Sequence, residues 1–168
     1  MLTQRVRSWA RKVKKAQRLD PTRFGLNVYV GLSSFFAHRY DRAIEVFNQA
    51  VQLGRGAEWA IWMIGQANEE RGDYSTAIES FRTAELAQGG KPELVKQKYD
   101  ELREAYEKSN QEGYWEKKLE FAQQAFEGGG RLWQALDVAA VYAHLHNREM
   151  AFRWQCECRD RCWLSPGR

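Results

Sequence analysis

The residue types with the greatest chemical capacity in this chain include three histidines, His38, His144 and His146. They lack the His-Glu-x-x-His spacing that brings two imidazoles to one zinc ion. His144 and His146 lie two residues apart, so a helix would direct them to different faces. We interpret His38 and His146 as turn residues, because they occupy corresponding positions in two copies of the repeat described below.

The three cysteines, Cys156, Cys158 and Cys162, lie in one terminal segment, where they cannot all pair with one another. Cys158 and Cys162 stand four residues apart, as two ligands of one metal ion on a helix would. A structural zinc site requires four ligands, and only three thiols are available locally. We therefore interpret all three as free thiols, with Cys158 packing like an alanine. We expect no metal site and no cofactor.

Two further patterns match functional motifs only in part. Residues 128–131 read Gly-Gly-Gly-Arg, but they lack the Gly-Lys-Ser/Thr ending of a phosphate-binding loop and follow a helical segment instead of a strand. Glu69 and Glu70 have no matched partner in the sequence and are typical of a solvated helix face. Because no set of catalytic residues emerges, we expect that the chain is not an enzyme.

The elements that position these residues follow a repeat of 34 residues. Small residues allow two helices to approach closely, and an aromatic residue fills the space between neighbouring helix pairs. The spacing predicts helical hairpins over residues 24–57 and 58–91, after a leading helix over residues 1–20. The recurring residues are Gly31, Ala43, Phe47 and Ala50, which return as Gly65, Ala77, Phe81 and Ala84.

This pattern resembles the tetratricopeptide repeat, which couples a Gly or Ala of one helix to an Ala, aromatic, Ala series in the next. A further copy over residues 131–163 keeps Ala139 and Ala151 at the same separation, while Gln155 and Cys158 replace the aromatic residue and the last alanine. The resemblance implies an all-α fold, a right-handed α-solenoid of helical hairpins. One leading helix and four hairpins predict about nine helices in a single array over residues 1–168.

Residues 92–130 depart from the repeat, because Ala77 and Ala151 are 74 residues apart instead of 68. Helical periodicity over residues 94–108 and 114–126 predicts an irregular helical pair. Pro92 suits the first turn of the first helix. With Gly113-Tyr114-Trp115 in this pair and the later Ala151-Phe152-Arg153-Trp154, residues 92–163 are similar to the repeat regions attached to many bacterial transcription regulators and signalling enzymes.

Positive charge is concentrated at the N-terminus, where residues 1–23 carry eight Lys/Arg and one acid, in a chain of net charge +4. Apolar residues recur there at helical spacing, which predicts a basic amphipathic helix. We favour a truncated repeat that packs its apolar face on the next helix. The alternative is contact with nucleic acid or an anionic membrane, where each basic residue contributes about 1 kcal/mol. The candidate basic patch is Arg11, Lys12, Lys14 and Lys15.

The resemblance also implies a concave groove, lined by the first helix of each hairpin. Its expected positions are unusually aromatic, and large rigid side chains at such a surface favour partner binding. For Trp59 and Trp62 the alternative is packing within the core. The predicted partner-binding residues are Val28, Leu32, Phe36, Trp59, Trp62, Met63 and Gln66.

Some family members hold the terminal carboxylate of a chaperone tail in this groove with a clamp of Lys, Arg and Asn side chains. No clamp is present here, so a chaperone-tail partner is not expected. The matched positions carry Val28, Leu32, Met63, Trp133 and Asp137.

The leading hypothesis is therefore a non-enzymatic interaction module or scaffold that binds a protein, as a peptide or helix, in an apolar concave groove. The alternative is a regulatory or sensor domain of a larger signalling or transcription protein, with a basic helix that contacts nucleic acid or membrane. Uncapped array ends favour homo-oligomers. We expect a cytoplasmic location, because the sequence shows neither a signal peptide nor a run of about 18 uncharged apolar residues.

Overall fold

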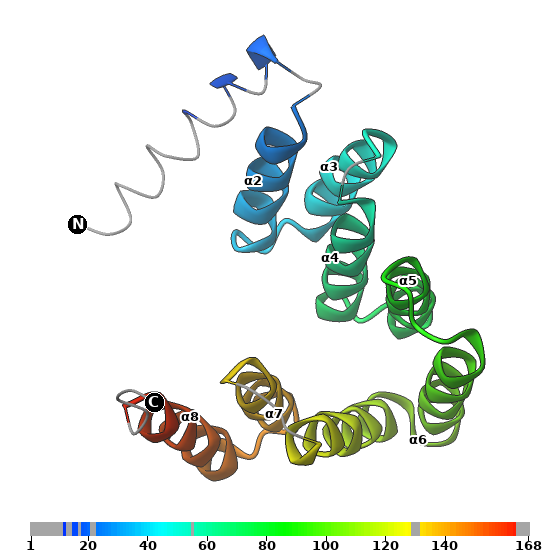
Figure 1. Cartoon of the computed structure of the whole chain (residues 1–168), viewed down its shortest axis with the longest axis vertical. Helices are drawn as coiled ribbons and strands as arrows, with labels where there is room; N and C mark the ends of the chain where they lie inside the picture. Colours follow the sequence, from blue (N-terminus) through cyan, green and yellow to red (C-terminus); the bar gives the residue numbers. More distant parts are fainter. Residues whose placement is uncertain are drawn as a thin grey trace. The chain divides into compact units, whose positions relative to one another are not determined.

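The computed structural model describes residues 12, 15–16, 18–20, 23–54, 56–128 and 132–163, with the side chains at 132–133 and 157–163 left out. Every regular element within these ranges is a helix, and they contain no strand, which confirms the all-α prediction. The helices are α2 (Phe24–Phe35), α3 (Tyr40–Gln52), α4 (Ala57–Glu70), α5 (Tyr74–Ala87), α6 (Pro92–Glu127), α7 (Leu132–His144) and α8 (Arg148–Trp163) (Figure 1).

The described part thus holds seven helical elements, which does not match the predicted count of about nine. The irregular pair expected over residues 92–130 is present in α6, where two helices are joined across non-helical backbone at Ser109 and Asn110. Most of the leading helix lies outside the described residues. Of the helices described, none has the length and apolar character needed to cross a membrane.

The chain divides into two compact units, Met1–Tyr99 (unit 1) and Asp100–Arg168 (unit 2). The division falls inside α6, within the segment whose sequence departs from the 34-residue repeat. In unit 1, α2 packs on α3, α3 on α4 and α4 on α5. The helices form two hairpins, α2–α3 and α4–α5, and Figure 1 shows the first helix of each hairpin to the left of the second.

Glycine and phenylalanine form the central contact of both hairpins in unit 1. A Cβ added at Gly65 would lie 2.7 Å from a ring carbon of Phe81, and one added at Gly31 would collide with the ring of Phe47. Both rings are buried, as are the repeat alanines of α3 and α5. The ring therefore occupies the space that a side chain at the glycine position would need, which is why the two residue types recur together.

Left-handed backbone ends the first helix of each hairpin. His38, Gly72 and His146 occupy the same repeat position, and their φ angles are +55°, +85° and +57°. Asn110, with φ +52°, marks the break inside α6. A residue in this conformation at a helix end lets the backbone amides that follow bond to the last carbonyls. The prediction that His38 and His146 are turn residues is confirmed.

The second helix of two hairpins begins with a side-chain cap. Asp73 accepts a hydrogen bond from the backbone N–H of Thr76 at 3.2 Å at the start of α5. Asn147 accepts one from Met150 at 3.1 Å at the start of α8. Each cap satisfies an N–H group that the helix itself cannot bond.

Unit 2 is held together by aromatic contacts of α6 with α7 and α8. The indole of Trp115, on α6, stacks on the imidazole of His144 with ring centroids 3.9 Å apart. Phe126 packs edge-on against Trp154 of α8 with centroids 5.0 Å apart. Tyr114 and Trp115 are both buried, so the middle of α6 supplies the large core residues of this unit.

Candidate protein-binding surface

The predicted groove residues of α2 lie on one face of that helix, four residues apart. Val28 and Leu32 are partly buried, and Leu32 packs against the core cluster of Ala43, Phe47 and Met63. Phe36, the C-cap residue that follows α2, is 74% exposed. Helical spacing of four places these side chains in a row, and Phe36 at the end of the row is the exposed one.

The predicted residues of α4 divide between the core and the surface. Trp59 packs on Phe47 with ring centroids 6.0 Å apart. Trp62 lies 6.1 Å from the ring of Phe81, and 41% of it remains exposed. Gln66 is partly buried and donates a hydrogen bond to Glu69 at 3.4 Å. Trp59 and Trp62 therefore contact the rings of different hairpins, and Trp62 presents the larger surface to solvent.

The assignment of Met63 to the groove surface is corrected by the structure. Met63 is only 5% exposed and joins Ala43 and Phe47 in the core cluster between α3 and α4. One residue along a helix is a rotation of about 100°, so Met63 and Trp62 belong to different faces. The surface that remains consists of Val28, Leu32, Phe36, Trp59, Trp62 and Gln66, and we call it the α2–α4 surface.

Polar groups border the exposed end of this surface beyond Phe36. The side chains of His38 and Tyr40 are hydrogen-bonded, with Nδ1 and the hydroxyl oxygen 2.7 Å apart. Burial, the charge of Glu70 and a hydrogen bond to Glu70 raise the pKa of Tyr40 above its ordinary value. The hydroxyl therefore stays protonated at neutral pH, and it is hydrogen-bonded to both His38 and Glu70.

The helix junction behind this surface is fixed by one arginine. Arg71 contacts Asp41 of α3 at 2.7 Å, Asp73 at 3.2 Å and the side-chain oxygen of Asn68 at 2.9 Å. The buried amide of Asn68 also donates to the carbonyl of Ile64 at 3.0 Å. The end of α4 thereby contacts Asp41 of α3 and Asp73, the N-cap of α5.

The basic patch is described only in part. Lys12 and Lys15 are exposed, while Arg11 and Lys14 lie outside the described residues. Cys156 is an exposed free thiol, and the side chains of Cys158 and Cys162 are outside the described set. Where side chains are described, no three of His, Cys, Asp and Glu are grouped as metal ligands would be.

Two positions compared with the chaperone-tail clamp fall in unit 2. The side chain of Trp133 lies outside the described residues. Burial raises the pKa of Asp137, and the positive charge of Lys118 acts in the opposite direction. Lys118 also lies over the indole of Trp115, 5.1 Å from its centroid. The charge interaction of Lys118 with Asp137 therefore links α6 to α7, while its contact with Trp115 lies within α6.

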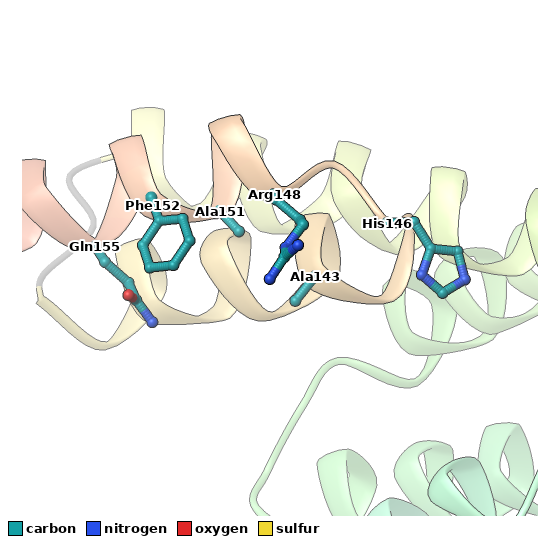
Figure 2. A pocket seen from close by; sticks show the side chains of 6 residues that line it. All are labelled: Ala143, His146, Arg148, Ala151, Phe152 and Gln155. Atoms are coloured by element: carbon teal, nitrogen blue, oxygen red, sulfur yellow. The ribbon is translucent and has the colours of Figure 1, made fainter.

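A pocket in unit 2 was missed by the sequence reasoning. It has a volume of about 390 Å³ and lies on the α7–α8 hairpin (Figure 2). The signal that could have revealed it was the replacement of the repeat's aromatic residue by Gln155, which leaves the space of a ring unfilled. Its lining residues are Ala143, His146, Arg148, Ala151, Phe152 and Gln155.

No known protein family and no curated protein sequence matches this chain. The tetratricopeptide resemblance therefore rests on the 34-residue recurrence of residue types in the sequence.

Proposed function

We propose that this protein is a non-enzymatic interaction module that binds a peptide or helix of another protein on the α2–α4 surface. In this proposal the hairpins stack as a right-handed tetratricopeptide-type solenoid, and the α2–α4 surface belongs to its concave side. The 34-residue recurrence and the packing of α2, α3, α4 and α5 in succession support that arrangement.

The observation that carries the proposal is the exposure of two large aromatic side chains of the predicted groove beside rings that are buried. Phe47 and Phe81 are buried, whereas Phe36 and Trp62 remain 74% and 41% exposed. The ring of Phe36 is not needed to fill the core, since both glycine–phenylalanine contacts are complete without it. Exposed aromatic residues on a rigid helical scaffold are typical of binding hot spots.

The polar groups around this surface support a mode of binding. Apolar side chains of a partner would cover Phe36 and Trp62, while His38, Gln66 and Glu70 at the margin offer hydrogen bonds to its backbone or polar groups. An apolar centre with a polar margin is the usual anatomy of a protein interface. The partner segment should therefore be amphipathic.

Selection of a random peptide library on the immobilised full chain, followed by calorimetry with the enriched peptides, tests the proposal. Phe36→Ala should weaken binding by about 2 kcal/mol, roughly 30-fold, and leave the melting temperature nearly unchanged. Phe36 is the cleaner probe, because the ring of Trp62 also packs on Phe81.

Leu94→Ala is the matched control, since Leu94 is another strongly exposed apolar residue of unit 1 and lies on α6 instead of α2 or α4. It should leave peptide affinity unchanged. Failure to enrich any peptide, or equal loss of affinity in both variants, would contradict the proposal.

A further inference from the structure

The α7–α8 hairpin repeats the design of the α2–α3 hairpin at a distance of 108 residues. His38 corresponds to His146, and both adopt left-handed backbone at the turn. Ala43 corresponds to Ala151, and Asp41 to Glu149. Because the residues correspond, the face of the α2–α3 hairpin that packs against α4 can be compared directly with the same face of the α7–α8 hairpin.

In the α2–α3 hairpin this face is covered by α4. Met63 is buried against Ala43 and Phe47, and Phe35 and Trp59 pack on the same cluster. Charged groups close the far end of the contact. Arg71, which follows α4, pairs with Asp41 at 2.7 Å, and the neighbouring Glu70 is hydrogen-bonded to Tyr40.

The α7–α8 hairpin lacks the two aromatic rings that fill this face. Ala143 stands where the first hairpin has Phe35, and Gln155 where it has Phe47. The pocket of about 390 Å³ lies at these positions, with Phe152 63% exposed beside it. Figure 2 shows the side chains of Phe152 and Gln155 on α8 and that of Ala143 on α7.

The charged residues at this face also differ between the two hairpins, because a basic residue precedes the acidic one in the α7–α8 hairpin. Arg148 stands at the position of Tyr40, and Glu149 at the position of Asp41. A helix placed here as α4 is placed on the first hairpin would meet a cation and then an anion near its C-terminal end. An acid followed by a base is the complementary pair, and Glu70 and Arg71 of α4 have this order.

We propose that the α7–α8 pocket receives an amphipathic helix of another protein, separate from the α2–α4 surface, with the residue pattern of α4. That helix carries a large aromatic residue, an apolar residue four positions later, and an acid–base pair eleven and twelve positions after the aromatic residue, as Trp59, Met63, Glu70 and Arg71 do. Its aromatic side chain fills the volume that Phe35 and Phe47 take up in the first hairpin. Its acid meets Arg148 and its base meets Glu149.

A fluorescent synthetic peptide with the sequence of residues 56–73 is the probe, titrated with the full chain and followed by fluorescence anisotropy. We expect saturable binding that Ala143→Leu weakens at least about tenfold, because the added side chain occupies the pocket. Ala125→Leu is the matched control, since Ala125 is an exposed alanine of α6 outside the pocket lining, and it should not change the affinity.

A charge exchange tests the orientation of the helix. Glu149→Arg should weaken binding of the probe, and a peptide in which Arg71 is replaced by Glu should recover part of the loss. Absence of saturable binding, or binding that Ala143→Leu leaves unchanged, would overturn the proposal. It would also be overturned if sedimentation showed a dimer of the chain alone that Ala143→Leu dissociates, because a second copy would then be the occupant.

Discussion

The hairpins of the two units solve the same packing problem differently. In unit 1 the pairs Gly31–Phe47 and Gly65–Phe81 place a ring directly on a glycine. In unit 2 the corresponding pair is Ala139 and Gln155. In the arrangement of unit 1, a methyl group at either glycine would collide with the ring, so the ring would have to shift to accommodate it. The difference shows that packing at the second position depends on the residue at the first.

The ring also connects one hairpin to the next. Phe47 touches Gly31 in its own hairpin and Trp59 in the following one. Gln155 carries no ring, and the matched face of the α7–α8 hairpin holds a pocket. In the part of the chain that the structure describes, α4 therefore covers this face of the α2–α3 hairpin, and the matched face of the α7–α8 hairpin is hollowed.

Truncation of Phe47 and of Gln155, which occupies the corresponding repeat position, gives the largest expected difference in unfolding free energy between the units. Phe47→Ala should lower the free energy of unfolding by about 3 to 5 kcal/mol, because a fully buried aromatic side chain is removed. Gln155→Ala should change it by less than about 0.5 kcal/mol, as substitutions at exposed polar positions usually do. Urea denaturation followed by circular dichroism measures both. Similar losses in the two variants would show that the hairpins do not differ in this way.

Enlargement of the small repeat residue gives the next largest effect. Ala43→Leu and Ala77→Leu should each destabilise the protein by about 1 to 3 kcal/mol, since both alanines are buried where helices touch. Ala151→Leu should cost less, because Ala151 is only partly buried and borders the pocket. Melting temperatures of the three variants rank these costs. A neutral result at both Ala43 and Ala77 would mean that the repeat has been placed on the wrong residues.

Much of the fold could be predicted because the repeat encodes local packing. The burial of Phe47 and Phe81 and the turn positions of His38 and His146 all follow from a 34-residue period. Helical periodicity also predicts the two helices that make up α6, over residues 94–108 and 114–126. A break confined to two residues leaves the periodicity on either side intact, so the sequence pattern does not show where between the two stretches the backbone breaks.

The candidate surfaces were harder to predict than the fold. Met63 was assigned to the groove because one residue of uncertainty in helix phase moves a side chain from one face to the next. The stack of Trp115 on His144 joins residues 29 positions apart that share no repeat spacing. The pocket lies where two rings of the first hairpin are replaced by Ala143 and Gln155; the sequence shows these replacements, but only the folded hairpin shows the resulting hollow.

Removal of the helix caps at Asp73 and Asn147 gives the smallest expected change in stability, and the two caps can be compared one for one. Asp73→Ala and Asn147→Ala should each cost about 1 kcal/mol at neutral pH, because each removes one acceptor for an amide in the first turn of a helix. The caps differ in charge. Burial would raise the pKa of Asp73, but the hydrogen bond from Thr76 and the guanidinium of Arg71 outweigh it, and the pKa lies below its ordinary value.

A carboxyl group whose pKa is lowered by folding stabilises the protein above its unfolded pKa, about 3.9 for aspartate, and this contribution is lost as the pH falls through the folded value. The cost of Asp73→Ala should therefore be full at pH 7 and diminish when the pH is lowered to about 3. The cost of Asn147→Ala should not change over this range, because an amide does not titrate. Urea denaturation at both pH values separates the two caps. If the cost of Asp73→Ala were the same at pH 7 and pH 3, the charge of Asp73 would contribute nothing, and the cap of α5 would act through its hydrogen bond alone.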